Sequence, residues 1–197
     1  MGRLILASTS PQRRAILAGL GADFEVVAPD YDEAPMPGTA AEVVVARALG
    51  KAQSVAAARP ERPVVGVDTE VVLDGDEVLG QPADAEAARA MLRRLAGREH
   101  RVLSGVAVIG AGESTACVET RVRLRALTEA ALEAYVATGE WRGRAGGYAI
   151  QAGGGGLVEG IDGDLDNVIG LPVGALRALL AAEGHALPAA GGNPAPT

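Results

Sequence analysis

Hydroxyl groups and positive charges are concentrated near the start of the chain, in Ser8, Thr9, Ser10, Arg13 and Arg14. The apolar run at 4–7 predicts a buried strand, and Ser10 and Pro11 are typical of the N-cap and first position of a helix. A strand that turns directly into a helix presents free helix amides beside these hydroxyls and guanidinium groups. This combination is typical of a site for a phosphate-bearing ligand. An ordinary capped helix with two solvated arginines would account for the same residues.

Three more charged residues are candidates for chemistry. Asp68 follows a β-branched apolar run that predicts a central strand ending at Asp68-Thr69. Ligands of open α/β sheets bind at the carboxyl ends of strands, so Asp68 could hold a metal ion or activate water, or else cap the following turn. Glu33 lies in a proline-containing loop and by itself predicts only a solvated acid. Lys51 lies one turn after Arg47 in a predicted helix, and alone it would extend its amine into water.

Length and composition exclude several classes of protein. The chain has 197 residues, of which 48% are hydrophobic, so it can form one domain with a sizeable core. The net charge of −7 argues against a nucleic-acid or anionic-membrane partner, and an anionic ligand would need a local basic pocket or a bound metal. No apolar run reaches the roughly 20 residues of a membrane helix, and no signal-peptide pattern is present. We therefore expect a cytoplasmic protein.

The elements that would position these residues alternate between helix and strand, which predicts an α/β fold with a mixed sheet. After the first helix, which Gly21 ends, a capping box of Thr39 and Glu42 opens the next. Helices are predicted over about 40–58, 84–95, 131–136 and 172–182, and strands over 4–7, 24–27, 63–68, 101–108, 114–125 and 157–161. Residues 70–73 are expected to continue extended, up to a hairpin turn at 74–76. Residues 162–167 predict a polar turn. One domain would span 1–184, followed by a disordered Ala/Pro/Gly-rich tail at 185–197.

Six motifs, in order, resemble the Maf family of nucleoside triphosphate pyrophosphatases, which was once named for septum formation. They are LASTSPQRR at 6–14, GVDT at 66–69, GQP at 80–82, MLRRLAG at 91–97, AGGYAIQ at 145–151 and VIGLP at 168–172. Each motif alone is weak, but together they cover nearly the whole chain. The resemblance implies a mixed, twisted sheet flanked by helices, with a deep cleft between two lobes as in inosine triphosphatase. A homodimer is also common in the family.

The resemblance also implies an activity: hydrolysis of a nucleoside triphosphate to the monophosphate and diphosphate with a divalent metal, Mg²⁺ or Mn²⁺. This activity would remove non-standard or excess nucleotides, with a link to cell division arrest. Asp68 matches the proposed general base and metal ligand of the family, and Glu33 matches a carboxylate that assists metal binding. The residues that would bind the substrate are Ser8, Ser10, Arg13, Arg14, Lys51 and Gln81.

Selection of the base is assigned by the resemblance to three positions, Gln12, Thr69 and Gln151. Thr69 and Gln151 agree with the pyrimidine-preferring branch of the family, whereas Gln12 replaces its usual arginine. Gln81 likewise stands where the family usually has a lysine, while Arg144 keeps the charge of another usual lysine. The two missing charges would weaken triphosphate binding or change the preferred nucleotide.

These missing charges leave a second class of function open, a non-catalytic nucleotide-binding regulator of cell division that binds without turnover. Sequence-specific nucleic-acid binding is disfavoured, because the chain lacks an aromatic and basic stacking surface. His100 and His185 lack metal-ligand spacing and are expected at the surface. Cys117, the single cysteine, is expected to pack in a strand rather than to act as a nucleophile.

Overall fold

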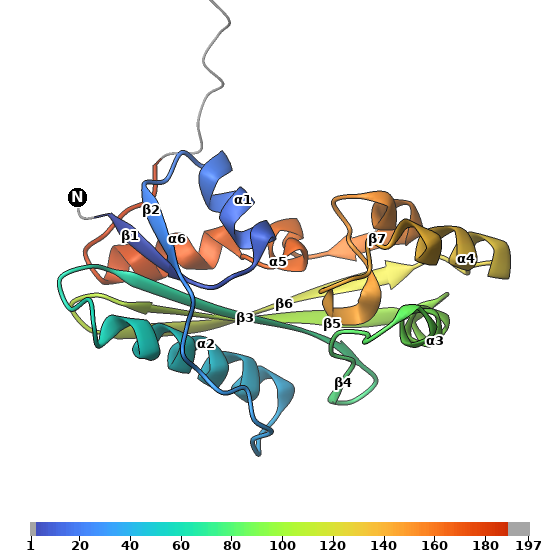
Figure 1. Cartoon of the computed structure of the whole chain (residues 1–197), viewed down its shortest axis with the longest axis horizontal. Coiled ribbons are helices and arrows are strands. Elements are labelled where there is room, and N and C mark those ends of the chain that lie inside the picture. The colour runs from blue at the N-terminus through green and yellow to red at the C-terminus, as the bar shows by residue number, and fades with distance from the viewer. Residues whose placement is uncertain (1–2, 189–197) are drawn as a thin grey trace, which may run out of the picture.

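A computed structural model describes residues 3–188, and within them seven strands form one mixed sheet flanked by helices (Figure 1). The strands are β1 (Leu4–Ala7), β2 (Phe24–Val27), β3 (Val64–Leu73), β4 (Glu77–Val78), β5 (Glu99–Ile109), β6 (Glu113–Leu124) and β7 (Val158–Asp162). The helices are α1 (Pro11–Gly19), α2 (Ala40–Ala56), α3 (Ala85–Leu95), α4 (Glu129–Thr138), α5 (Leu165–Ile169) and α6 (Val173–Ala182), with short 3₁₀ turns η1 (Ala145–Gly147) and η2 (Gly153–Leu157). The predicted α/β fold is confirmed.

The sheet has a parallel part and an antiparallel part, which share β3. Its order is β2-β1-β3-β5-β6-β7, with β4 paired to β3. β1 is parallel to both of its neighbours, whereas β3, β5, β6 and β7 pair in antiparallel fashion. The pairing of β1 with β3 ends at Ala7 opposite Gly66, but β3 continues against β5. The residues just after Gly66 therefore lie beside the end of β1.

Asp68 lies in the middle of β3, so the prediction that a strand ends there is wrong, whereas the predicted extended stretch at 70–73 and the hairpin turn at 74–76 are confirmed. β3 continues because Val71, Val72 and Leu73 are buried and pair with neighbouring strands. The strand that does end at this level is β1, one position across the sheet. Asp68 therefore lies at the expected ligand position, beside the carboxyl end of a strand. The strand that ends there is β1, not β3, which carries Asp68.

The helices divide over the sheet as Figure 1 shows: α2 covers one face, α1, α5 and α6 lie on the other, and α3 and α4 lie together at the far end. Two apolar clusters form the main cores. One joins α3 and α4 to β5 and β6 through residues such as Leu92 and Tyr135. The other joins α1 and α6 to β1 and β3 through residues such as Leu17 and Leu176. These two cores correspond to the two predicted lobes.

Two glycines allow α2 to approach the sheet closely. A Cβ atom at Gly66 on β3 would overlap the carbonyl oxygen of Ala48 on α2, and one at Gly105 on β5 would overlap that of Val44. Because α2 carries Lys51, this close contact sets the height of the lysine over β3.

We expect Gly66→Ala to lower the free energy of unfolding by about 1–3 kcal/mol, because the added methyl group forces α2 away from β3. The matched control is Gly174→Ala in α6, where an added Cβ meets no atom within 4 Å. The control should be neutral or stabilising by up to about 1 kcal/mol, since alanine is the better helix former. Denaturant unfolding of both variants measures the difference, and unchanged stability of Gly66→Ala would contradict the packing argument.

Three sequence predictions outside the site differ from the structure. The predicted polar turn at 162–167 contains part of α5, which Asp164 caps by accepting a hydrogen bond from the amide of Asp166 at 2.8 Å. Cys117 is exposed rather than packed. Residues 185–188 lie against the body of the protein, since Leu187 is buried in the α1–α6 core, which differs from the disordered tail predicted from residue 185. Residues 189–197 lie outside the described part, and the domain boundary at 184 stays a prediction.

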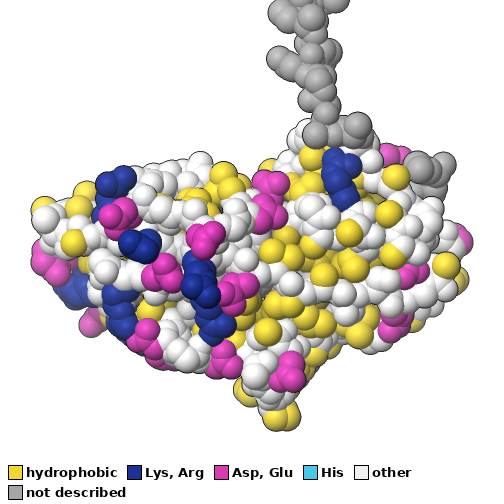
Figure 2. Space-filling view, turned by 180° about the vertical axis from the view of Figure 1, so that it is seen from behind, with side chains coloured by type: hydrophobic (Ala, Val, Ile, Leu, Met, Phe, Trp, Pro, Cys, Tyr) yellow, Lys and Arg dark blue, Asp and Glu magenta, His cyan; other side chains and the backbone are white. Residues whose placement is uncertain are grey.

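The surface at the α3–α4 end carries acidic and basic side chains close together (Figure 2). Exposed ion pairs join the two helices there, for example Arg93 to Glu129 at 2.6 Å. Such exposed pairs contribute less than about 1 kcal/mol each, so they add little to the stability of this lobe. None of the helices within residues 3–188 has the length and apolar character needed to cross a membrane.

Candidate active site

A polar cavity of about 590 Å³ brings together segments that are far apart in the sequence. This volume is typical of small-molecule sites. The predicted site residues that line it are Ser8, Ser10, Gln12, Arg13, Glu33, Lys51, Asp68, Thr69, Gln81 and Gln151. The structure thus gathers residues from α1, α2 and β3, from the turn between β1 and α1, and from the loops after β2, β4 and η1 around one opening. The predicted cleft is confirmed.

Arg14 is the predicted substrate-binding residue that the structure does not bring to this cavity. It is exposed on α1, whereas its neighbour Arg13 lines the cavity. Arg14 does not line this cavity, and its role in binding phosphate stays a prediction.

Arg13 ties three segments of the site together. Its Nη1 donates to Ser8 Oγ at 3.0 Å, its Nη2 to Thr69 Oγ1 at 3.1 Å, and its Nε to the carbonyl oxygen of Gly170 at 2.9 Å. Burial lowers the pKa of Arg13, against the opposing charges of Asp68 and Glu33, yet a guanidinium stays protonated in proteins. The end of β1, the middle of β3 and the end of α5 therefore meet at one guanidinium group.

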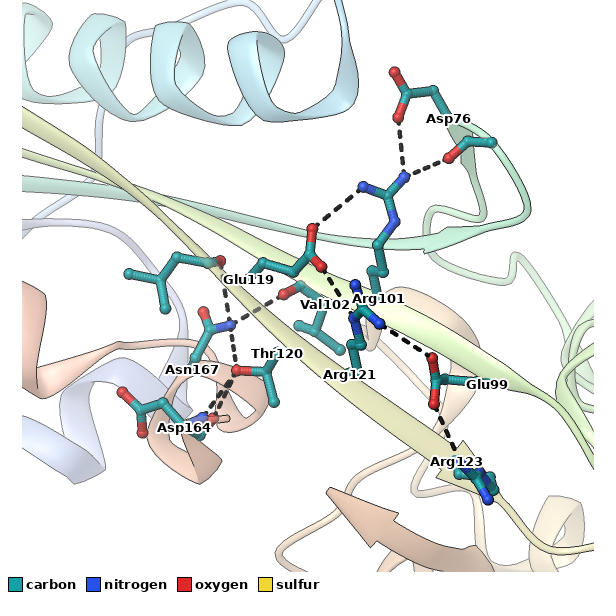
Figure 3. Close-up of polar contacts among 12 residues, drawn as sticks. Asp76, Glu99, Arg101, Val102, Glu119, Thr120, Arg121, Arg123, Asp164 and Asn167 are labelled. Atoms are coloured by element: carbon teal, nitrogen blue, oxygen red, sulfur yellow. Dashed lines mark hydrogen bonds and ion pairs between the residues drawn. The ribbon is translucent and has the colours of Figure 1, made fainter. Parts of the chain in front are cut away.

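The carbonyl group that Arg13 uses is positioned by a buried asparagine, Asn167 on α5 (Figure 3). Its Nδ2 donates to Thr120 Oγ1 at 3.0 Å and to two strand carbonyl oxygens, one on β5 and one on β6. Thr120 Oγ1 in turn bonds both backbone groups of Asp164, the N-cap of α5. These bonds fix α5 on the sheet, and with it the carbonyl oxygen of Gly170.

Lys51 lies at the centre of the acidic part of the site. Its Nζ is 2.6 Å from Asp68 Oδ1 and 2.6 Å from Glu33 Oε1, and its side chain is only 8% exposed. Burial acts to raise the pKa of Glu33, but the hydrogen bond and charge of Lys51 outweigh it, so this pKa is lowered. Lys51 is therefore not a lysine that extends into water, and Glu33 is not a free solvated acid.

The second oxygen of Asp68, Oδ2, is buried and has no hydrogen-bond partner within the described chain. Arg47 Nη1 lies 3.9 Å from it. Asp68 does not cap a turn, because its hydrogen bond comes from the Lys51 side chain. Buried acceptors without a partner are rare, and this one is available to take a proton from water or to contact a cation.

Glu70 is a site residue that the sequence reasoning missed. It lines the cavity, and its Oε1 accepts a hydrogen bond from Arg47 Nη1 at 2.9 Å. Burial, and then the charge of Asp68, raise its pKa to about 7 despite the opposing effect of Arg47. Side chains alternate along a strand, so residues 68 and 70 lie on the same face of β3, the face that α2 covers with Arg47 and Lys51. This alternation is the sequence signal that could have identified Glu70.

The residues present fit a divalent cation that is shared with a ligand. The cavity is lined by three acids, Glu33, Asp68 and Glu70, and three cations, Arg13, Lys51 and Arg144, so basic side chains do not outnumber acidic ones on its wall. A polyanionic ligand would therefore need additional positive charge. Carboxylate oxygens suit Mg²⁺ or Mn²⁺, which keep several waters and bind through one or two carboxylates plus phosphates. Within the described chain no group of three or more His, Cys, Asp or Glu side chains is placed to hold a metal ion.

His100 is buried behind the cavity, so the expectation of a surface histidine is wrong. It is 2% exposed, and its Nε2 lies 2.8 Å from the hydroxyl oxygen of Tyr148, which lines the cavity. Its Nδ1 has no partner within the described residues. Burial lowers the pKa of His100 to about 4. His100 lies at the start of β5, two residues before the buried Val102, so its side chain is on the same face of the strand. This alternation is the sequence signal that indicated a buried side chain.

We expect the contribution of His100 to stability to be lost as the pH decreases from about 6.5 to about 4. In that window the unfolded chain protonates His100 but the folded chain does not, so the unfolded state binds more protons and stability rises with pH. The shift corresponds to about 3 kcal/mol. Denaturant unfolding across this range should show that the free energy of unfolding of the parent protein, relative to that of His100→Gln, decreases as the pH falls. Parallel curves for the two proteins would contradict the burial of a neutral histidine.

The fold and the cavity together define a class of protein, an α/β enzyme with a cleft for a phosphorylated small molecule. A buried carboxylate in this cleft is available to bind a metal ion or to accept a proton. Within this class, the chain belongs to the Maf family, since the model described as Maf-like protein matches residues 3–183. The resemblance stated from the six motifs is thereby confirmed.

Relatives match almost the whole chain. A protein named dTTP/UTP pyrophosphatase from Myxococcus xanthus is 50% identical over 186 residues, which are 94% of each chain. A protein of the same name from Nitratidesulfovibrio vulgaris is 49% identical over 185 residues, 92% of this chain and 88% of the relative. Among solved structures, a nucleoside-triphosphatase / dITP/XTP pyrophosphatase from Mycobacterium abscessus aligns with a TM-score of 0.43 at 20% identity, covering 62% of this chain and 74% of that one. That last likeness is too low to support any conclusion.

Proposed function

We propose that this protein hydrolyses dTTP and UTP to the nucleoside monophosphate and diphosphate with the help of a divalent metal ion. The names of the relatives confirm the predicted reaction class, a hydrolase acting on nucleoside triphosphates. The preferred base, the metal and the roles of individual residues are part of the proposal. The observation that supports it most is the unpartnered Asp68 Oδ2, in the same cavity as Arg13 and Lys51.

In this reaction the oxygen of water bonds to the α-phosphorus while the bond from that phosphorus to the bridging oxygen breaks, and diphosphate leaves. Asp68 Oδ2 takes the proton of the attacking water. Lys51 holds Oδ1 of the same carboxylate, so that Oδ2 is left for the water. A metal ion held by Asp68 and Glu33 with the phosphates would neutralise charge on the phosphate oxygens when bound.

The triphosphate would be bound at the junction of β1 and α1. Ser8 and Ser10 offer hydroxyl groups there, and Arg13 and the helix amides supply positive charge. Gln81, in the loop after β4, faces the same cavity with a neutral amide. This arrangement supports binding of phosphate oxygens from two sides of the cavity.

Three residues are proposed to select the base: Gln12, Thr69 and Gln151. All three line the cavity. Gln12 Oε1 accepts a hydrogen bond from Ser10 Oγ at 3.0 Å, which leaves its amide nitrogen as a donor. Thr69 Oγ1 lies 2.9 Å from Ser104 Oγ and also bonds Arg13, so its position is fixed. Fixed polar groups of this kind favour recognition of a base through its carbonyl and imide groups.

A substrate panel tests the proposal. With Mg²⁺ or Mn²⁺, the protein should release diphosphate from dTTP and UTP at least about tenfold faster than from purine triphosphates, a difference of about 1.4 kcal/mol in barrier. Release of orthophosphate as the first product would contradict it. Tight nucleotide binding without any product would favour the regulator of cell division instead. The homodimer and the link to cell division arrest stay predictions from the family resemblance, and the cytoplasmic location stays a prediction from the sequence pattern.

A further inference from the structure

Arg47 on α2 brings a cation close to the Asp68 carboxylate, and the reaction proposed above does not use it. Its Nη1 donates to Glu70 Oε1 at 2.9 Å and lies 3.9 Å from Asp68 Oδ2. Its Nη2 donates to the carbonyl oxygen of Glu33 at 3.2 Å. Its Nε is buried and has no hydrogen-bond partner within the described chain. The guanidinium therefore has an unused donor beside the carboxylate oxygen that the reaction needs.

A direct bond from Arg47 to Asp68 Oδ2 would block the chemistry of this carboxylate. Charge-assisted N–H···O bonds are about 2.7–2.9 Å long, so the guanidinium needs to move by only about 1 Å to form one. Arginine also pairs with carboxylates through two parallel bonds, and the unpaired Nε of Arg47 could supply the second. Such a pair would occupy the acceptor that the attacking water or a divalent cation uses.

Glu70 is placed to hold Arg47 away from this oxygen. It follows Asp68 by two residues on the same face of β3, and it accepts a hydrogen bond from the same Nη1 that faces Asp68 Oδ2. The side chains of Arg47 and Glu70 are only 15% and 14% exposed, so this bond is screened less by water and salt than a surface ion pair. Oε1 can accept the bond whether Glu70 is ionised or protonated, because a protonated carboxyl group keeps an acceptor oxygen.

We infer that Glu70 is a positioning residue, which binds Arg47 Nη1 and thereby keeps Asp68 Oδ2 open to the attacking water or to a divalent cation. Glu70 acts through Arg47 and needs no contact of its own with substrate or metal. The inference rests on the proposed function, because it concerns the carboxylate to which that function assigns the chemistry. Its distinguishing consequence is that Arg47 is harmful to activity once Glu70 no longer holds it.

The first test compares Glu70→Leu with Glu70→Gln. Leucine accepts no hydrogen bond, whereas glutamine keeps an acceptor oxygen for Arg47. Binding of Mn²⁺ is measured by electron paramagnetic resonance in the presence of α,β-imido-dTTP, which cannot be hydrolysed. Glu70→Leu should weaken Mn²⁺ binding, and lower kcat for dTTP, at least about tenfold, because Arg47 then forms a bond to the Asp68 carboxylate. Glu70→Gln should stay close to the parent protein in both measurements.

The double variant Arg47→Met, Glu70→Leu separates positioning from a merely structural role. It removes the cation together with the residue that holds it, so Asp68 Oδ2 is open again. Mn²⁺ binding and kcat should therefore recover most of what Glu70→Leu loses, and Glu33 keeps its contact with Lys51 at 2.6 Å. A merely structural pair predicts no such recovery, because the double variant lacks more contacts than the single one.

The matched control is Glu25→Leu, which breaks the ion pair of Glu25 with Arg62 at 2.7 Å, outside the cavity. It should bind Mn²⁺ and turn over dTTP as the parent protein does. A double variant no better than Glu70→Leu, or equal losses in Glu70→Gln and Glu70→Leu, would overturn the inference.

The two proposals fail in different ways. If Mn²⁺ binding follows the expected order across the variants but the parent protein does not hydrolyse dTTP, the proposed function fails and the inference stands. If the parent protein hydrolyses dTTP and Glu70→Leu is indistinguishable from it in both measurements, only the inference fails.

Discussion

Asp68→Asn is expected to lower kcat/KM for dTTP by about 10²–10⁴-fold while the protein stays folded. The amide has nearly the same shape as the carboxylate and its oxygen can still accept the hydrogen bond from Lys51. It cannot take a proton from water, and it is a poor ligand for a hard divalent cation. The loss should therefore appear mainly in kcat. Steady-state release of diphosphate measures it, with circular dichroism as the check on folding.

The matched control for this variant is Asp76→Asn, in the turn between β3 and β4. Asp76 pairs with Arg101 at 3.0 Å on the surface and does not line the cavity. It should keep full activity. An Asp68→Asn variant with the turnover of the parent protein would remove Asp68 from the chemistry.

Lys51→Met is expected to reduce both activity and stability. It removes the cation that lies 2.6 Å from both Asp68 and Glu33, and leaves the buried Asp68 carboxylate without its hydrogen-bond donor. Removing one partner of a buried ion pair costs about 3–5 kcal/mol, and the lower value applies here because Glu33 is 53% exposed. Activity should fall at least about 10²-fold, because the catalytic carboxylate is no longer held in place. Urea unfolding and steady-state kinetics of the variant measure the two effects.

The double variant Lys51→Met, Asp68→Asn separates these two effects. Neutralising residue 68 removes the buried unpaired charge, so the double variant should be more stable than Lys51→Met alone yet remain inactive. Lys51→Met with the stability of the parent protein, or a double variant less stable than either single one, would contradict the ion-pair cluster described for this site.

Local sequence signals were sufficient to predict those features that depend only on residues close together in the sequence, such as the ends of helices. The cap at Ser10, the proline after it and the glycine at position 21 define α1 as predicted. The same holds for the capping box that opens α2. Because these residues act on the backbone beside them, the turn from β1 into α1, and with it the first wall of the cavity, could be read from the sequence.

The remaining features depend on contacts that are distant in the sequence. That Asp68 lies beside the end of a neighbouring strand follows from where β1 stops pairing with β3, which no residue near 68 encodes. The choice of Arg13 over Arg14 depends on how α1 is rotated against α5. The burial of His100 depends on Tyr148 packing against it, and the raised pKa of Glu70 arises from its burial beside Asp68. The sequence pattern identifies candidate residues for such positions. Which of them lie in the site depends on how the helices and strands pack together.

The identity of the phosphorus that water attacks is the most direct test of the chemistry assigned to the Asp68 cavity. Hydrolysis of dTTP in ¹⁸O-labelled water, followed by mass spectrometry of the products, reports it. We predict that the label appears in dTMP and that the diphosphate is unlabelled, because the new bond forms at the α-phosphorus. Label in the diphosphate, or release of labelled orthophosphate, would place the attack at another phosphorus and contradict the proposed reaction.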